Sequence, residues 1–410
     1  MDGLVRPVDF LLPNESIDLK KWAVVACDQF TSQPEYWERL GEFTKGSPSV
    51  LNIIYPEVYL ADRTEERIEK INKTISEYLS GGVFRQVKDS YILISRDTVT
   101  ASGRLGLLAS IDLEKFDFRP FSKAPVKATE ETVLERIPPR LKIRKNAELE
   151  LPHIILLIDD PDMTVLEPLY AGRDRLEKLY DTELNMSGGR VEGYRVKDTA
   201  AVNAALSKLL SPAEQTKKYG YDAGFLFAVG DGNHSLVTAK KHWESIREGL
   251  SEEERLNHPA RYALAEIENL WSPAIKFEPI HRIIFGNTEG LLAELESAAG
   301  GVSKLGVLTA GGRTEIAVSD NSIEAISQIQ RFIDKKLKDK APFEVDYIHG
   351  DDYLKEIHKF KGGIALFMPK VKKSELFPYV LKQGVMPKKS FSMGDAEEKR
   401  YYLEAKKITK

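Results

Sequence analysis

The sequence has 410 residues, of which 42% are hydrophobic and 30% charged, and its net charge is −4. These proportions are typical of a folded globular protein and argue against a disordered chain, and the length allows roughly two or three domains. Binding to nucleic acid through the phosphate backbone requires an excess of Lys and Arg, which this composition lacks, so we expect no specific nucleic-acid partner.

Cysteine usage and hydropathy restrict the chain further. Cys27 is the only cysteine, so no internal disulfide can form and a zinc cluster of several thiolates is excluded. The first residues lack the apolar run of a secretory signal, and no apolar stretch approaches the roughly 20 residues of a membrane span. We therefore expect a cytoplasmic protein with no membrane partner, and the oligomeric state stays open.

The first part of the chain alternates short apolar runs with helical patterns. Residues 21–27 and 50–55 are apolar and predict buried strands. From Thr64 to Leu79, apolar residues recur every three or four positions, which predicts an amphipathic helix that ends at the following glycines. Further strands are predicted at 91–95, 105–113 and 153–158, and helices at 34–43, 165–180 and 199–210.

The second part continues this alternation. The apolar run 224–229 predicts a central strand, and Ser235 can cap a helix that extends to about Glu248. Because strands and helices interleave, we expect an α+β fold of mixed β-sheets with covering helices. The expected regions are an N-terminal α/β region (1–150), a core (151–286), a small α/β lobe (287–345) and a C-terminal segment (346–410) that returns to the core.

A polar loop, Gly230–Ser235, separates the predicted central strand from the helix after it. Glycines permit positive φ and close approach of a ligand, the first amides of a helix lack internal partners, and the helix dipole adds positive charge there. The alternative is a tight turn with His234 hydrogen-bonded in the core. Neither nucleotide P-loop nor dinucleotide-binding spacing is present. The predicted phosphate- or nucleotide-binding residues of this loop and its helix are Gly230, Asp231, Gly232, Asn233, His234, Ser235 and Thr238.

Several stretches of the chain carry a resemblance to a known family. They are residues 22–29 with 31–37, 132–140, 230–235, 258–262, 277–282, and 391–394 with 397–402. Together they resemble the domain-of-unknown-function family 1015, which occurs in bacteria and archaea, over nearly the whole chain. The resemblance names a family but implies no activity.

The Asp231-Gly232-Asn233-His234 pattern is also similar to the phosphate-binding loop of the superfamily that contains ParB, sulfiredoxin and archaeal free-serine kinases. This likeness implies a ParB/sulfiredoxin-like core that binds a nucleotide or phosphorylated small molecule. It also implies phosphoryl transfer or hydrolysis, by a kinase-like phosphotransferase or a phosphatase. The superfamily has arginine after the histidine, whereas Ser235 stands here, and Arg261 and Arg282 are candidates to replace that cation. A nucleotide-gated binding protein of the ParB type and a structural protein with no phosphate site stay open as alternatives.

Four further residues complete the predicted site. Glu130, ahead of a basic run, is the predicted general base beside His234 as the second catalytic residue, although a solvated charged segment is the alternative. Asp160 ends a predicted strand and, with Asp231, is a predicted ligand of Mg²⁺ that accompanies a nucleotide; a turn is the alternative. His281 and Arg282 are predicted second phosphate contacts, with an edge strand and ordinary ion pairs as the alternative.

Two other segments carry polar or aromatic side chains outside the predicted site. Asp28, Gln29 and Thr31 follow a predicted strand and are interpreted as polar pocket lining. Arg400, Tyr401 and Tyr402 near the C-terminus are interpreted as packed anchors or pocket walls.

Overall fold

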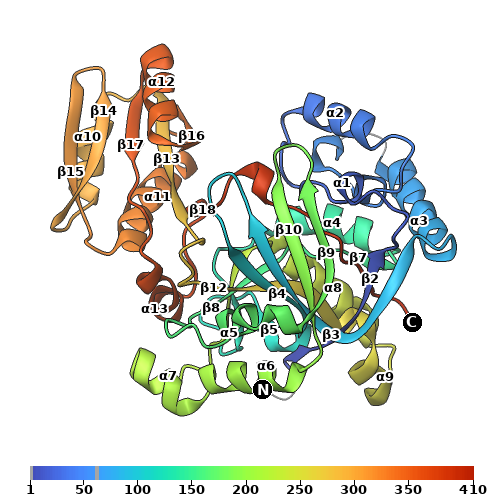
Figure 1. The fold of residues 1–410 in the computed structure, drawn as a ribbon. Coiled ribbons are helices and arrows are strands. Elements are labelled where there is room, and N and C mark those ends of the chain that lie inside the picture. Colours follow the sequence, from blue (N-terminus) through green and yellow to red (C-terminus); the bar gives the residue numbers. More distant parts are fainter. Residues whose placement is uncertain (1–2, 61–63) are drawn as a thin grey trace. The chain divides into compact units, whose positions relative to one another are not determined.

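The computed structural model describes residues 3–60 and 64–410, and the chain forms two compact units (Figure 1). The first unit comprises Met1–Ala128, Thr132–Ile275 and Asp395–Lys410, and the second comprises Thr129–Glu131 and Lys276–Gly394. These units divide the chain differently from the four expected regions, because strand pairing joins the expected N-terminal region and core in one sheet.

The first unit is built on an 11-stranded sheet in the order β5-β6-β11-β8-β12-β4-β3-β10-β9, with β1 beside β4 and β2 beside β3. Its strands are β1 (Val5–Arg6), β2 (Val8–Pro13), β3 (Phe84–Asp97), β4 (Arg104–Asp112), β5 (Phe116–Asp117), β6 (Val126–Ala128), β8 (Ile155–Ile158), β9 (Glu177–Leu184), β10 (Gly189–Val196), β11 (Phe227–Asp231) and β12 (Tyr262–Asn269). The strand β11 is parallel to β6 and antiparallel to β8, so the sheet is mixed and the predicted α+β class is confirmed. A separate pair joins β7 (Leu149–Glu150) to β19 (Lys406–Lys407).

Helices and short 3-10 turns connect these strands. The helices of the first unit are α1 (Leu19–Trp22), α2 (Pro34–Thr44), α3 (Thr64–Ser80), α4 (Ile137–Arg144), α5 (Leu166–Ala171), α6 (Thr199–Leu209), α7 (Pro212–Tyr219), α8 (Asn233–Arg247) and α9 (Glu252–Asn257). The 3-10 turns are η1 (Val50–Asn52), η2 (Glu57–Tyr59), η3 (Leu113–Lys115), η4 (Leu134–Arg136), η5 (Arg173–Arg175), η6 (Pro259–Arg261) and η7 (Ala396–Glu398).

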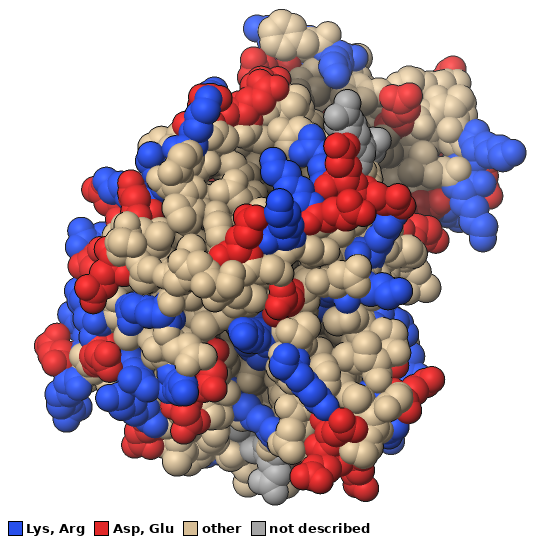
Figure 2. Space-filling view, turned by 90° about the vertical axis from the view of Figure 1, so that its right-hand side faces the viewer, with Lys and Arg blue, Asp and Glu red and all other residues tan. Residues whose placement is uncertain are grey.

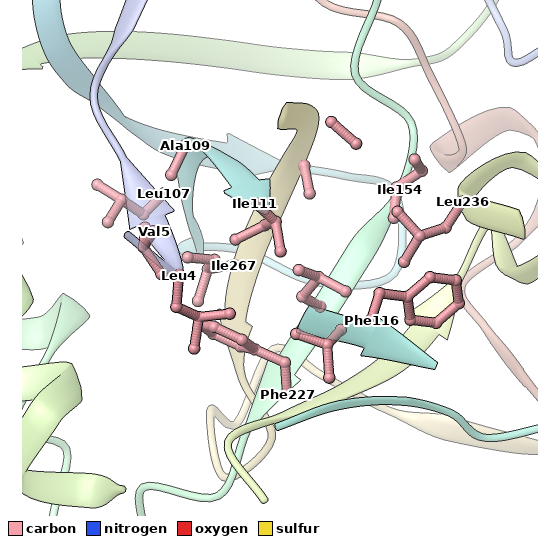
Figure 3. Close-up of a cluster of buried hydrophobic side chains, with 14 of the residues drawn as sticks. Leu4, Val5, Leu107, Ala109, Ile111, Phe116, Ile154, Phe227, Leu236 and Ile267 are labelled. Atoms are coloured by element: carbon pink, nitrogen blue, oxygen red, sulfur yellow. The ribbon is translucent and has the colours of Figure 1, made fainter. Parts of the chain in front are cut away.

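Apolar side chains cover both faces of this sheet. Successive residues of a strand point to opposite faces, so Leu107 enters one core and Leu108 enters the other. The first core contains Phe227 and Ile267 together with Leu236 from α8, as Figure 3 shows. Burial on both faces explains why the central strands are nearly continuous apolar runs.

Three sequence predictions about local structure are wrong. Residues 21–27 contain the end of α1 and an extended stretch in which only Val25 forms an isolated bridge, and residues 50–55 begin with η1. Both segments are apolar because they are buried in the core, and not because they pair in a sheet. The predicted helix 165–180 stops at Gly172, and β9 begins at Glu177.

The second unit has its own 6-stranded sheet, ordered β15-β14-β17-β13-β16, with β18 beside β13. Its elements are β13 (Phe277–Gly286), α10 (Leu291–Ala298), β14 (Ser303–Thr309), β15 (Gly312–Val318), α11 (Ser322–Lys338), β16 (Phe343–His349), α12 (Asp351–Lys361), β17 (Ile364–Phe367), α13 (Lys373–Gln383) and β18 (Phe391–Met393). The predicted lobe 287–345 supplies α10, β14, β15 and α11 to this unit, but the sheet also requires β13 and β17 from outside that range.

Candidate functional site

The loop after β11 turns sharply into α8. Gly232 is the N-cap residue of α8 and has a left-handed backbone with φ of 78°. A side chain at this position would bring its Cβ to 3.0 Å from the Cα of Ile154. Glycine is therefore required here for both conformation and space, which lets the backbone start the helix directly after the strand.

The first amides of α8 are available to a ligand. Leu236 N donates to Gly232 O at 3.0 Å, whereas the amides of Asn233, His234 and Ser235 have no acceptor among the residues that the structure describes. Amides at a helix N-terminus carry partial positive charge and bind anions. These three amides are the observation from which an anion site can be proposed.

Asp231 holds the loop to the C-terminal segment of the chain. Its Oδ1 accepts from Gly232 N at 2.8 Å, and its Oδ2 lies 2.8 Å from the ammonium of Lys399. Burial acts to raise the pKa of Asp231, but the Lys399 ammonium, the Gly232 amide and His153 together outweigh it and the pKa is lowered. The carboxylate is therefore ionised and engaged by protein groups.

His234 is a neutral residue at neutral pH. Burial, followed by the charges of Arg140 and Arg136, lowers its pKa to about 4. Val133 N donates to His234 Nε2 at 3.3 Å, so the proton of the neutral ring lies on Nδ1. The imidazole can donate a hydrogen bond from Nδ1, but it contributes no positive charge to an anion site.

Two arginines, Arg136 and Arg140, supply the positive charge near His234. Both belong to the segment 132–140 that carries the family resemblance, and α4 packs against α8. Arg140 forms an ion pair with Glu57, and Arg136 is exposed. Arg136 and Arg140 are thus the arginines that act on His234 within the first unit, whereas Arg261 pairs with Asp112 and Arg282 belongs to the second unit.

Other predicted loop residues have protein partners. Ser235 Oγ lies 2.7 Å from His153 Nε2, and Thr238 Oγ1 donates to His234 O at 2.7 Å. The Oδ1 atom of Asn233 is buried and has no partner among the described residues. The Thr238 hydroxyl therefore faces its own helix, while the Asn233 amide is the loop side chain with an unused polar atom.

A small cavity lies beside Asp231 and contains residues that sequence analysis left out of the site. Asp28, His153, Lys399 and Arg400 line it together with Asp231. The sequence patterns indicate Asp28 as pocket lining and Arg400 as a packed anchor or pocket wall, but they do not indicate a role for His153 or Lys399. The signal that could have found them is the concentration of charged residues in stretches that carry the resemblance.

A row of buried charges extends along the same face of the sheet. On β12, Leu264 lies in the apolar core and the next residues on that face are Glu266 and Glu268, which are 5% and 0% exposed. Arg104 of β4 donates to Glu268 Oε1 through Nε at 2.8 Å and Nη2 at 2.5 Å. Paired in this way, the charges are tolerated in the interior.

Tyr402 links this row to the C-terminal segment. Its hydroxyl accepts from Arg96 Nη1 at 3.0 Å and donates to Glu266 Oε2 at 3.1 Å. Arg96 also donates to Glu398 O at 2.6 Å. The C-terminal segment that carries Lys399 is therefore anchored to the sheet by buried hydrogen bonds.

Comparison with known proteins places the chain in a family. A model described as "Protein of unknown function (DUF1015)" matches residues 11–408. The chain belongs to the DUF1015 family. No functionally curated protein matches this DUF1015 sequence.

Three solved structures are similar to the DUF1015 chain, each at 10% sequence identity. A conserved hypothetical protein from Pyrococcus furiosus matches with a TM-score of 0.37, covering 77% of this chain and 97% of its own. A free serine kinase in complex with AMP matches with a TM-score of 0.39, covering 77% and 94%. SbnI from Staphylococcus aureus, with a C-terminal truncation, matches with a TM-score of 0.36, covering 70% and 83%.

The remaining predicted residues of the DUF1015 chain have defined surroundings. Asp160 is 1% exposed, and its carboxylate accepts from Thr164 N at 2.6 Å and Val165 N at 3.0 Å. Arg261 forms two hydrogen bonds with Asp112, at 2.9 and 2.7 Å. Asp160 thus closes a turn, and Arg261 is engaged in an ion pair.

Glu130, His281 and Arg282 belong to the second unit, whereas His234 belongs to the first. His281 is 1% exposed; its Nδ1 accepts from Met368 N at 3.0 Å and its Nε2 lies 2.9 Å from Asp351 Oδ1. Arg282 is 0% exposed and donates to Lys389 O at 2.9 Å. Within the second unit, these two side chains serve packing and hydrogen bonding between β13 and its neighbours.

Neither predicted magnesium ligand has a geometry that suits the ion. Both carboxylate oxygens of Asp231 contact protein donors, and both oxygens of Asp160 accept from the Thr164–Val165 turn. In the described part of the chain, no group of three or more His, Cys, Asp or Glu side chains could hold a metal ion. Among the same residues, no helix has the length and apolar character to cross a membrane.

Proposed function

We propose that the first unit binds a nucleotide or another phosphorylated small molecule at the N-terminus of α8, and transfers or hydrolyses its phosphate. The observation that carries this proposal is the set of three amides, from Asn233, His234 and Ser235, which have no acceptor among the described residues. Phosphate is an anion that such a helix end binds well.

The charges around these amides support an anionic ligand. Arg136 and Arg140 act electrostatically on His234, and Lys399 lies against Asp231. Arginine binds phosphate through its planar array of donors, which would compensate for the serine at position 235. The remaining contact is the Nδ1–H of neutral His234, which is directed by the bond from Val133 N.

A chemical step requires few additional groups. Catalysis of phosphoryl transfer consists mostly of positioning and charge stabilisation, which amides and guanidinium groups supply. The predicted general base, Glu130, belongs to the second unit, so the step proposed here for the first unit names no base. Since the predicted magnesium ligands are engaged by protein groups, no step here depends on the ion.

The charge distribution argues against the ParB-type alternative. Figure 2 shows Lys and Arg interspersed with Asp and Glu over one face, without a broad basic patch. The net charge of −4 agrees with that view. Binding to DNA through its phosphates would need a concentration of cations.

The binding step is tested by thermal unfolding with phosphate, pyrophosphate, AMP, ADP and ATP, each with and without magnesium. A ligand at 100 times its dissociation constant stabilises the fold by about 2.7 kcal/mol. We expect this stabilisation for at least one compound. The variants His234→Ala and Arg136→Met should bind that compound with at least fivefold lower affinity. Arg136 is exposed, so its replacement leaves the fold intact.

Arg39→Met, on the exposed side of α2, is the matched control and should bind as the wild type does. Phosphorus NMR of the bound nucleotide, with and without added small hydroxyl compounds, then separates transfer from hydrolysis and from binding without turnover. Absence of stabilisation by every compound, or equal loss in the Arg39→Met control, would contradict the proposed site.

A further inference from the structure

A second cavity lies in the N-terminal part of the first unit, between α2, the segment with η1 and η2, and α3. Its volume is about 410 Å³. Sites for small organic ligands have volumes of roughly 300–1,000 Å³ and are lined mainly by apolar and aromatic side chains. This cavity is therefore large enough for a small organic molecule and shares no lining residue with the cavity beside Asp231.

Aromatic side chains form its walls and are held in place by hydrogen bonds. Trp37 and Tyr55 line the cavity and are 2% and 4% exposed. The Tyr55 hydroxyl donates to Tyr59 O at 3.0 Å, and the Tyr78 hydroxyl accepts from Asn52 Nδ2 at 2.9 Å. Because these rings are fixed by their partners, the cavity is preformed, and the half-buried Tyr59 and Tyr78 offer aromatic surface to a ligand.

The charged residues in the lining are both cationic. Arg67 lies over the Tyr59 ring at 4.3 Å from its centroid, and Lys70 follows one turn later on α3. Among the described residues that line the cavity there is no Asp or Glu. A ligand that carries negative charge would match this lining, and a cationic ligand would be repelled.

We propose that this cavity binds a small planar aromatic anion, meaning one or two rings that carry a carboxylate, sulfonate or phosphate. The ring contacts the half-buried Tyr59 and Tyr78, and the anionic group lies toward Lys70. This site is independent of the phosphate loop and of the function proposed for it.

The probe for this site is 8-anilinonaphthalene-1-sulfonate, whose planar naphthalene-sulfonate part belongs to the proposed class of ligand, with the uncharged N-phenyl-1-naphthylamine as its neutral counterpart. Energy transfer from the four tryptophans of the chain to the bound probe reports binding, and the variants below locate the site. We expect one saturable site for the sulfonate. Lys70→Glu should weaken sulfonate binding at least fivefold and leave binding of the neutral compound within twofold.

Lys73→Glu is the matched control, because Lys73 is an exposed residue of the same helix that does not line the cavity. It changes the net charge equally and should bind both probes as the wild type does. Thr74→Phe, which places a ring in the cavity, should abolish binding of both, with thermal unfolding to verify the fold.

Equal sulfonate affinity of the wild type and Lys70→Glu would overturn the charge assignment. Undiminished binding by a folded Thr74→Phe variant would overturn the site. Because His234→Ala leaves this cavity intact, it should bind the sulfonate normally even if the phosphate proposal fails, so the two proposals fail separately.

Discussion

The ammonium of Lys399 lies 2.8 Å from the carboxylate of Asp231, although 168 positions separate them in the chain. The two side chains are only 22% and 23% exposed, so water screens their interaction weakly. This pair joins the C-terminal segment, which carries Arg400 and Tyr402, to the loop that begins α8. Both segments carry the family resemblance, and in the structure they lie next to each other at this ion pair.

The Lys399–Asp231 pair should contribute measurably to stability. We expect Lys399→Met to lower the free energy of unfolding by about 2 kcal/mol, somewhat less than the roughly 3–5 kcal/mol lost when a fully buried pair is broken. Urea unfolding measures this change. Adding Asp231→Asn should restore more than half of the loss, because the uncompensated carboxylate is then removed.

The control for this prediction is Lys241→Met. Lys241 forms a 2.8 Å pair with Glu244 in α8 but is 42% exposed, so its replacement should cost less than about 1 kcal/mol. If both lysine variants lose the same free energy of unfolding, the Lys399–Asp231 pair contributes no more to stability than an exposed ion pair does.

Gly106 on β4 makes room for a buried carboxylate. A Cβ at this position would lie 2.0 Å from Glu266 Oε1, and Glu266 is 5% exposed. We expect Gly106→Ala to lower the free energy of unfolding by about 1–3 kcal/mol, since Glu266 must move away from Tyr402. Chemical denaturation provides the measurement.

Gly41→Ala is the comparison. Gly41 lies in α2, and no atom would approach its added Cβ within 4 Å. Alanine is the better helix former, so this variant should be as stable as the wild type or gain up to about 1 kcal/mol. A Gly106→Ala protein of wild-type stability would show that Glu266 is not confined.

Glu404 should make stability depend on pH. Burial raises its pKa to about 7, and its Oε1 accepts from the Tyr180 hydroxyl at 2.5 Å. A carboxyl whose pKa is raised in the folded state favours folding in its protonated form. Its contribution is therefore complete below the ordinary pKa near 4.5 and is lost as the pH rises to about 7.

The test compares Glu404→Gln with the wild type in urea unfolding between pH 4.5 and 8. The free energy of unfolding of the wild type should fall as the pH rises through this range. In the variant this fall should be smaller, by up to about 3 kcal/mol. Parallel curves for the two proteins would place the Glu404 pKa near its ordinary value.

The imidazole of His234 should have a pKa well below the ordinary histidine value of 6.5. With its pKa lowered to about 4 in the fold, the unfolded chain binds more protons between about 4 and 6.5. The His234 contribution to stability is thus present above pH 6.5 and is lost as the pH falls toward 4. Proton NMR of the imidazole, assigned with His234→Gln, measures the pKa directly.

The pH dependence of unfolding gives a second readout for the same residue. The free energy of unfolding should rise less between pH 4 and 6.5 in His234→Gln than in the wild type. The difference between the two rises should be no more than about 3 kcal/mol. A His234 resonance that titrates near pH 6.5 would mean an exposed, solvated ring and would remove the argument for a neutral donor.

Much of the fold could be predicted from the sequence. Apolar patterns located α3, β4 and α8 to within a few residues, because helical spacing and apolar runs reflect the local backbone directly. The predictions failed at residues 21–27 and 50–55, where burial and not strand pairing explains the apolar run. Hydrophobicity alone does not distinguish these two causes.

By itself the sequence determined the sharp turn between strand and helix: Gly232 adopts the left-handed conformation that such a turn needs, whereas Gly230 belongs to β11. Only the tertiary structure decided which charges meet there. Lys399, Arg140 and Arg136 come from segments distant in sequence, and local spacing carries no information about such pairs. Contacts between remote segments depend on how strands pair and helices pack, so the cations around the loop became visible only in the folded chain.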